Sequence, residues 1–240
     1  TSAYLQLWGM PKKQQLEQWL MKLIQKQQGN LDMSVFIIFD LENNKTIQYQ
    51  IMEDCVKIIT TDKILSRGKN ITPVIEARYL DGRTLEEKVE AIVKMLSKEN
   101  KTIATMESCT GGQLASEITN IVGASEVLKE SYVTYCNEAK VKFGVPEEII
   151  KQYSVYSKET AIAMSKSVVK CASADIGVGI TGQIGRIDPN NLGTSNNNVW
   201  CAIFENNKQV NFRICFIKDL PRTKQKGIII REVIETLCRL

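Results

Sequence analysis

The segment that decides the fold runs from Thr102 to Leu114 and reads TIATMESCTGGQL. Its first half is apolar and β-branched, which predicts a strand over Thr102–Met106. Its second half begins with glycines and continues with apolar residues at helical spacing, which predicts a helix. Ser108 then lies on the turn between them, where the first amides of a helix lack partners and the helix dipole is positive. We expect these amides to hold an oxyanion formed beside the Ser108 hydroxyl.

Helices and strands alternate along the rest of residues 81–240. Thr84 and Glu87 form a capping-box pattern at the start of one helix, and Ser157 can cap another that runs through Cys171. The other predicted elements are strands over Val127–Thr134 and Asp175–Thr181, short helices over Asn137–Phe143 and Pro146–Gln152, a hairpin of Val199–Phe204 with Val210–Ile217, and a final helix carrying Ile230, Val233, Ile234 and Leu237. This order predicts an α/β fold, namely a three-layer α/β/α domain with a mixed sheet.

Residues 1–80 are predicted to form a small α+β domain that precedes it. A helix is expected to open at Pro11, because apolar residues recur at helical spacing after it. Three β-rich runs follow, over Ser34–Phe39, Thr46–Met52 and Val56–Thr60. The segment Ser66–Asp81 contains glycine, proline and basic residues and is predicted to connect the two domains.

The composition excludes several classes of protein and of site. The net charge of +4 and the 43% apolar content are ordinary for a globular chain, and no nucleic-acid fingerprint appears. No apolar run approaches the ~20 residues that span a bilayer, and no export signal is visible, so we expect a cytoplasmic protein without membrane contact. The absence of histidine excludes Ser-His-Asp catalysis, and the seven cysteines form no close-spaced pair, so we expect free thiols, no metal site and no cofactor.

A serine can still be activated without histidine when a lysine supports it. Lys140 ends the segment TYCNEAK, close to the start of a predicted helix, where the dipole disfavours an ammonium. Gly111 and Gly112 would let a substrate approach the backbone beside Ser108. Two alternatives stay open: Ser108 or Thr110 caps the helix and has no other role, or the thiol of Cys109 is the nucleophile.

Several separated segments together resemble the CinA C-terminal domain family, whose characterised members are nicotinamide-nucleotide amidases. The resemblance covers about Thr84 to Leu240 and includes Thr105–Gly112, Val133–Lys140 and Ala174–Gly182. It implies deamidation of nicotinamide mononucleotide, with Ser108 as nucleophile and Lys140 as its base, and a homodimer. The further site residues that it implies are Tyr135, Asn137 and Thr181, which would orient the lysine or the amide, the substrate-binding positions Thr110, Gly111, Gly112, Gly182 and Gln183, and the phosphate-facing pair Arg222 and Lys226.

The chain also departs from the family pattern on the side that would face the substrate. The usual glycine-rich loop is replaced by Gly185–Asn190, the run Ser195–Asn198 precedes Val199, and Met106 and Cys136 stand where an alanine and a serine are usual. The alternative function is therefore a catalytically inactive nucleotide-binding or scaffold protein derived from the family. Residues 2–60 resemble the later half of inosine-triphosphate pyrophosphatases without their acidic metal-binding residues, so we assign this part no chemistry and interpret it as a degenerate remnant that serves packing or dimerisation.

Overall fold

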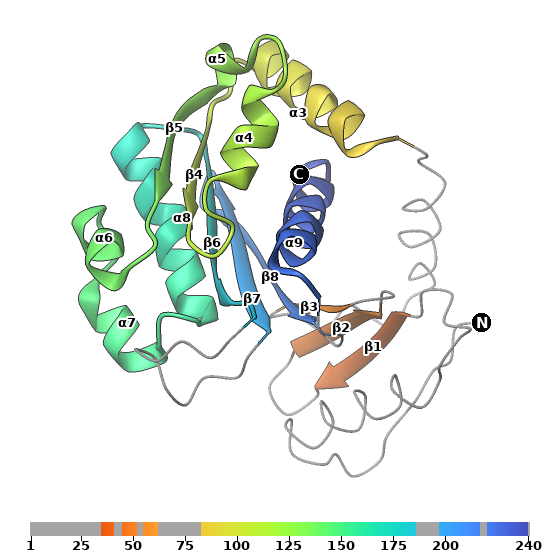
Figure 1. Cartoon of the computed structure of the whole chain (residues 1–240), viewed down its shortest axis with the longest axis vertical. Coiled ribbons are helices and arrows are strands. Elements are labelled where there is room, and N and C mark those ends of the chain that lie inside the picture. Colours follow the sequence, from red (N-terminus) through yellow and green to blue (C-terminus); the bar gives the residue numbers. More distant parts are fainter. Residues whose placement is uncertain are drawn as a thin grey trace. The chain divides into compact units, whose positions relative to one another are not determined.

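The computed structural model describes residues 35–40, 45–51, 55–61, 83–185, 197–216 and 220–239. The chain divides into two compact units, Thr1–Leu80 with Cys215–Lys218 and Asp81–Ile214 with Asp219–Leu240. The ribbon in Figure 1 shows the elements of each unit. Three predicted features lie outside the described residues. They are the helix after Pro11, the connection Ser66–Asp81 and most of the segment after Gly185 that departs from the family pattern.

The first unit contains an antiparallel meander, of which the backbone is described. Its strands are β1 (Val35–Asp40), β2 (Lys45–Ile51) and β3 (Cys55–Thr61). Val35 lies opposite Gln50 in the β1–β2 pair, and Ile51 lies opposite Val56 in the β2–β3 pair. The three predicted strands are confirmed to within a residue or two at their ends.

The second unit is built on a mixed sheet. Its strands are β4 (Ile103–Glu107), β5 (Leu128–Val133), β6 (Ile176–Gln183), β7 (Asn198–Glu205) and β8 (Lys208–Phe216, which belongs to this unit as far as Ile214), in the order β8-β7-β6-β4-β5. β4 runs parallel to β5 and β6, whereas β7 runs antiparallel to β6. Asn206 and Asn207 have φ angles of 44° and 62°, as a two-residue hairpin turn requires, and they join β7 to β8.

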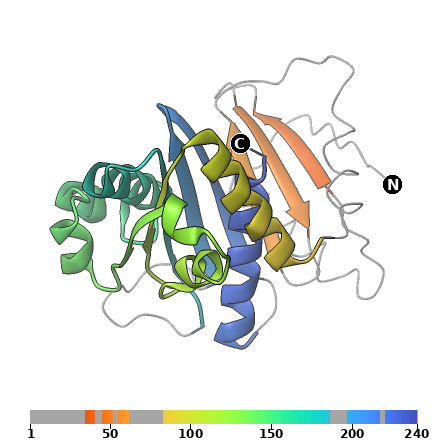
Figure 2. The same ribbon diagram turned by 90° about the horizontal axis from the view of Figure 1, so that it is seen from above.

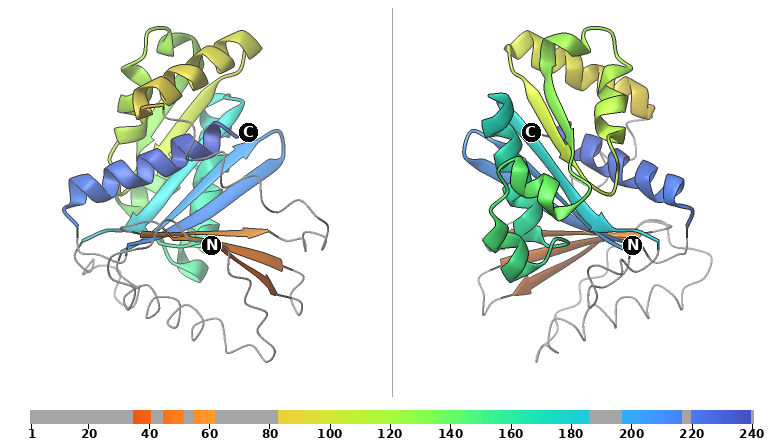
Figure 3. Two further views of the ribbon diagram at one scale, coloured as in Figure 1. Left: turned by 90° about the vertical axis from the view of Figure 1, so that its right-hand side faces the viewer. Right: turned by 60° about the vertical axis from the view of Figure 1, so that its left-hand side comes forward.

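Helices cover both faces of this sheet. They are α3 (Leu85–Glu99), α4 (Gln113–Thr119), α5 (Ala124–Val127), α6 (Asn137–Lys142), α7 (Glu147–Tyr153), α8 (Lys158–Ala172) and α9 (Arg222–Leu237). Figures 2 and 3 show α6, α7 and α8 on one side of the sheet and α3, α4 and α9 on the other. The predicted α/β class and its three layers are confirmed.

Local sequence rules explain most of the boundaries. The Thr84–Glu87 capping box starts α3, and the Ser157 hydroxyl accepts the Thr160 amide at the start of α8. Several boundaries differ from the prediction by one or two residues. β5 begins at Leu128, because residues 124–127 form the short helix α5, β6 extends past Thr181 to Gln183, and β8 begins at Lys208. Pro146 precedes α7 as its N-cap and is not its first helical residue.

Glycines on β6 bring α8 unusually close to the sheet. A Cβ on Gly177 would lie 2.1 Å from the Ser165 carbonyl oxygen, and one on Gly179 would lie 2.3 Å from that of Ala161. Ala104 and Met106 of β4 bury their side chains in the core on this α8 side. Because side chains alternate along a strand, Thr105 and Glu107 face the opposite layer, and both are fully buried.

Candidate active site

Ser108 and Lys140 meet at the carboxyl end of β4. Lys140 Nζ lies 3.2 Å from Ser108 Oγ and donates a hydrogen bond to the carbonyl of Thr134 at 2.7 Å. Lys140 is fully buried, and Ser108 is 4% exposed. The structure therefore brings together two side chains that are separated by 32 positions in the sequence.

Burial changes the acidity of this lysine. Because the surroundings of Lys140 desolvate its ammonium, its pKa falls from 10.5 to about 8. Nearby thiols (Cys109 and Cys136) and Glu138 raise the pKa, but their effect is smaller. A substantial fraction of Lys140 is then neutral near pH 8 and carries a lone pair beside the Ser108 hydroxyl. Desolvation is the leading cause of this shift, whereas we had expected the helix dipole to produce it.

The backbone fixes both members of the pair. The Ser108 amide donates to the Ile180 carbonyl of β6 at 3.0 Å, and the Thr134 amide donates to the Glu107 carbonyl at 2.8 Å. Thr134 in turn accepts Lys140 through its own carbonyl. A continuous chain of hydrogen bonds thus runs from the turn that carries the serine to the amine of the lysine.

The turn after Ser108 differs in one respect from the sequence prediction. The amides of Leu114 and Ala115 in the first turn of α4 donate to the Glu107 carboxylate at 3.2 and 3.0 Å. The expectation that the first-turn amides are free to hold an oxyanion is therefore wrong for these two. The amides of Thr110, Gly112 and Gln113 have no acceptor within the described ranges, so they are the donors still available there.

Cys109 has the properties of a core residue. It is 5% exposed, and burial raises the pKa of its thiol to about 12. The charge of Arg222 lowers the pKa of this thiol, but by less. A thiol with such a pKa is protonated at neutral pH and is a poor nucleophile. Of the two side chains, the hydroxyl of Ser108, beside Lys140, is the better candidate nucleophile, and neither Ser108 nor Thr110 caps α4.

Two cations of α9 reach the same turn. Lys226 Nζ lies 3.5 Å from the point where a Cβ on Gly111 would stand. Arg222 donates to the carbonyl of Ile184, and its other terminal nitrogen lies 3.4 Å from the Tyr135 hydroxyl. Tyr135 is 66% exposed, so these groups are accessible to a ligand in solution. The structure therefore gathers Tyr135, Arg222 and Lys226 around the serine turn.

The remaining predicted site residues take less direct positions. The hydroxyl of Thr181 is buried and donates to the Val155 carbonyl at 2.8 Å, so it is not hydrogen-bonded to Lys140. Asn137 is the first residue of α6 and is half-buried. Gly182 lies within β6, where a Cβ would stand 2.5 Å from Val199, and the neighbouring Gln183 is buried.

Three polar residues in this part of the unit, Gln225, Asn197 and Glu107, were not among the site residues predicted from the sequence. Gln225, on α9, is fully buried and donates through Nε2 to Asn197 Oδ1 at 3.2 Å, and the same oxygen accepts the Gly185 amide. Within the described part of the chain, Gln225 Oε1 and Thr110 Oγ1 are buried without a hydrogen-bond partner. The third residue is Glu107, which immediately precedes the serine. The sequence signal that could have identified Glu107 is its position: it is a carboxylate at the end of a strand, just before a helix that begins with glycines.

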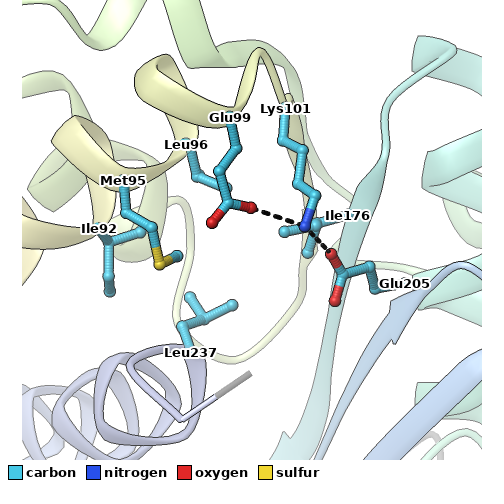
Figure 4. Close-up of a pocket in the computed structure, with 8 residues that line it drawn as sticks. All are labelled: Ile92, Met95, Leu96, Glu99, Lys101, Ile176, Glu205 and Leu237. Atoms are coloured by element: carbon cyan, nitrogen blue, oxygen red, sulfur yellow. Dashed lines mark ion pairs between the residues drawn. The ribbon is translucent and has the colours of Figure 1, made fainter.

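A pocket lies at the opposite end of β4 and β6 from the Ser108 turn, where these two strands begin. It measures about 110 Å³, and Figure 4 shows Lys101 in it between Glu99 and Glu205. The ammonium lies 2.8 Å from Glu99 and 2.9 Å from Glu205, and these bonds raise the pKa of Lys101 above its usual value. Lys101 therefore stays charged at neutral pH and, unlike Lys140, cannot serve as a base.

The described residues give two further negative findings. No group of three or more Cys, Asp or Glu side chains among them is arranged to hold a metal ion. None of their helices combines the length and the apolar character that crossing a bilayer requires.

Comparisons with known proteins agree on one family. The family model "CinA C-terminal domain" matches residues 85–240. A CinA-like protein of Kosmotoga olearia is 45% identical over 108 residues, which are 45% of this chain and 26% of the relative. A competence-damage inducible protein of Acetivibrio thermocellus is 33% identical over 186 residues, or 77% of this chain and 43% of the relative. The chain thus spans less than half the length of these curated relatives.

Solved structures give the same result for the fold. The competence/damage inducible protein CihA of Agrobacterium tumefaciens has a TM-score of 0.59 at 27% identity, covering 63% of this chain and 92% of that one. A CinA superfamily protein of Escherichia coli has a TM-score of 0.60 at 26% identity, covering 65% and 91%. The residues matched by the family model, 85–240, include both Ser108 and Lys140.

Proposed function

Because this chain belongs to the CinA C-terminal domain family, we propose that it is an amidohydrolase that converts nicotinamide mononucleotide to nicotinic acid mononucleotide and ammonia. The observation that carries the proposal is the 3.2 Å approach of Lys140 Nζ to Ser108 Oγ in a buried setting that lowers the pKa of the lysine. In line with the family resemblance, we propose a cytoplasmic homodimer.

The reaction takes place in two steps on these residues. Neutral Lys140 takes the hydroxyl proton of Ser108, and Oγ attacks the carboxamide carbon to form a tetrahedral intermediate. The Thr134 carbonyl holds one N–H of the amine, which leaves the lone pair for the serine. Lys140 then returns the proton to the leaving nitrogen as ammonia departs. Water, deprotonated by Lys140, attacks the acyl-enzyme, and the acid and free Ser108 result.

The charges near the turn suit a nucleotide. Lys226 lies beside Gly111, and Arg222 lies beside Tyr135 and close enough to Cys109 to affect its thiol, so both cations are near the serine turn. A phosphate attached to the substrate is attracted to both side chains, and Arg222 can bind it through two N–H groups. The free amides of Thr110, Gly112 and Gln113 are then assigned to the oxyanion of the intermediate.

Ammonia release from nicotinamide mononucleotide tests the proposal. Ser108→Ala is expected to abolish release, because no other hydroxyl or thiol replaces the nucleophile. Ser116→Ala is the matched control, since Ser116 is an exposed serine on α4, and it should retain wild-type turnover. A wild-type protein without activity, or an active Ser108→Ala variant, would contradict the proposed function.

The departures from the family pattern support a second candidate, a nucleotide-binding protein without turnover. The segment that follows Gly185 differs from the family loop, while Arg222 and Lys226 are present. On this alternative, pyridine nucleotides would raise the melting temperature of the protein, and no product would form. Product formation by wild type excludes it.

A further inference from the structure

Glu107 is a fully buried carboxylate next to the nucleophile, and the proposed reaction gives it no role. Its two oxygens accept the amides of Leu114 and Ala115, at 3.2 and 3.0 Å. Thr105 Oγ1 lies 3.4 Å from the same carboxylate and 2.9 Å from Ser131 Oγ. Thr105 Oγ1 donates its hydrogen to Ser131 Oγ, so the two backbone amides are the closer donors to the carboxylate.

These contacts offset two unfavourable features of this turn, a buried carboxylate and a helix start without a cap of its own. A buried carboxylate is expensive unless donors and positive charge compensate it, and the start of α4 supplies both. The helix in turn has no cap of its own: its N-cap is Gly112, at a φ of 89°, and its first turn contains no acidic residue. Glu107 therefore acts from the end of β4 as the cap that Gly112 cannot provide.

The backbone of Glu107 extends this arrangement to the lysine. Its carbonyl accepts the Thr134 amide at 2.8 Å, and the Thr134 carbonyl accepts Lys140 Nζ at 2.7 Å. The side chain of Glu107 thus fixes the far end of the serine turn, while its main chain is bonded to the residue that orients the base. Ser108 follows directly in the chain, and the Lys140–Ser108 contact closes the ring.

We propose that Glu107 is a positioning residue, whose carboxylate holds the Ser108 turn against α4 so that Oγ stays within reach of Lys140. This inference rests on the proposed Ser108–Lys140 chemistry. It also has a consequence for the substrate: because Glu107 occupies the amides of Leu114 and Ala115, the oxyanion is held by those of Thr110, Gly112 and Gln113.

The test uses a reaction that does not depend on the nucleotide. With p-nitrophenyl acetate, Ser108 Oγ forms a bond to the acetyl carbon, the ester C–O bond breaks, nitrophenolate leaves, and Lys140 takes the hydroxyl proton. The burst of nitrophenolate gives two quantities, the rate constant of acylation and the amplitude, which counts competent sites. Mass spectrometry of wild type and Ser108→Ala locates the acetyl group on Ser108.

Glu107→Gln keeps the size of the side chain and turns one acceptor into a donor that faces a backbone N–H. We expect the acylation rate constant to fall about 10- to 100-fold, because the nucleophile loses its alignment, while the burst amplitude stays at that of wild type. Where nicotinamide mononucleotide is turned over, kcat should fall by a similar factor with little change in KM. Glu107→Asp, which keeps the charge but shortens the reach, should lie between the two proteins.

Thr84→Ala is the matched control, since it removes the cap of a different helix, α3. It should lower the melting temperature without changing the acylation rate constant. A Glu107→Gln protein that reacts like wild type, or one in which only the amplitude falls, overturns the inference. If Glu107→Gln does not fold, the same criteria apply to Glu107→Asp. A wild type that is not acylated overturns the proposed function as well, whereas a reactive wild type with an equally reactive variant overturns Glu107 alone.

Discussion

Replacing Lys140 by methionine is expected to abolish turnover and also to change how stability depends on pH. The folded protein holds Lys140 with a pKa of about 8, against 10.5 for an exposed lysine. Below pH 8 both folded and unfolded chains keep the proton, and folding carries the full cost of burying the ammonium, roughly 3 kcal/mol. Above pH 8 the folded protein releases the proton while the unfolded chain retains it until about pH 10.5. Stability therefore rises with pH through this window.

The size of this effect follows from the two pKa values. Between pH 7 and pH 9.5, Lys140 should add about 2 kcal/mol to the free energy of unfolding of wild type. Lys140→Met lacks this increment. At pH 7 the variant escapes the burial cost but leaves the Thr134 carbonyl without its donor, which costs about 1–3 kcal/mol. It should therefore be close to wild type in stability at pH 7 and less stable at pH 9.5.

Urea unfolding at the two pH values measures the difference. With Trp8 and Trp19 replaced by phenylalanine, the fluorescence of Trp200 on β7 reports on the second unit alone. The quantity of interest is the change with pH in the difference between wild type and Lys140→Met, because other titrating groups cancel. An equal pH dependence in both proteins would refute the assigned burial of a titrating Lys140. Lys142→Met, which replaces an exposed lysine of the same helix, should retain turnover.

Three further outcomes are expected. The rate kcat/KM should rise with pH to a plateau with a midpoint near pH 8, as the neutral form of Lys140 accumulates, and a rate that falls through this range would contradict its role as base. Cys109→Ala should keep most of the turnover, because a buried thiol with a pKa of about 12 is not the nucleophile. Loss of turnover in a variant with a normal melting temperature would instead identify the Cys109 thiol as the nucleophile. Lys226→Ala should raise KM for nicotinamide mononucleotide by about tenfold or more with little effect on kcat, because phosphate binding is lost. The control Lys224→Ala, which replaces an exposed lysine, should leave KM unchanged. Equal KM values in the two variants would show that Lys226 is not part of the substrate site.

Local rules made much of the fold predictable. The capping box of Thr84 and the cap of Ser157 mark helix starts by short-range hydrogen bonds, and the alternation of strands and helices sets the three layers. The boundary between α5 and β5 was missed, because four helical residues at Ala124–Val127 are too few to produce a periodic signal.

The site was harder to predict from local sequence patterns, because its residues come together only in the folded chain. An isolated lysine such as Lys140 has the sequence features of a surface residue, and its full burial depends on packing across several elements. Arg222 reaches Tyr135 over a separation of 87 positions, which no local pattern encodes. The capping of α4 by Glu107 was missed for a related reason: the known capping patterns place the acceptor at the helix start and not at the end of the preceding strand.

The glycines of β6 have a consequence for how this protein can evolve. Any side chain at Gly177 or Gly179 would meet the main chain of α8, which cannot yield as a side chain can, so a library of variants should be depleted at these positions. Exposed positions such as Arg222 and Tyr135 meet no such barrier. Substitutions at these exposed positions can therefore change which ligand the second unit binds, while the glycines of β6 stay the same. Divergence among descendants should accumulate at the exposed positions of α9 and at the rim of the turn, and leave Gly177 and Gly179 of β6 unchanged.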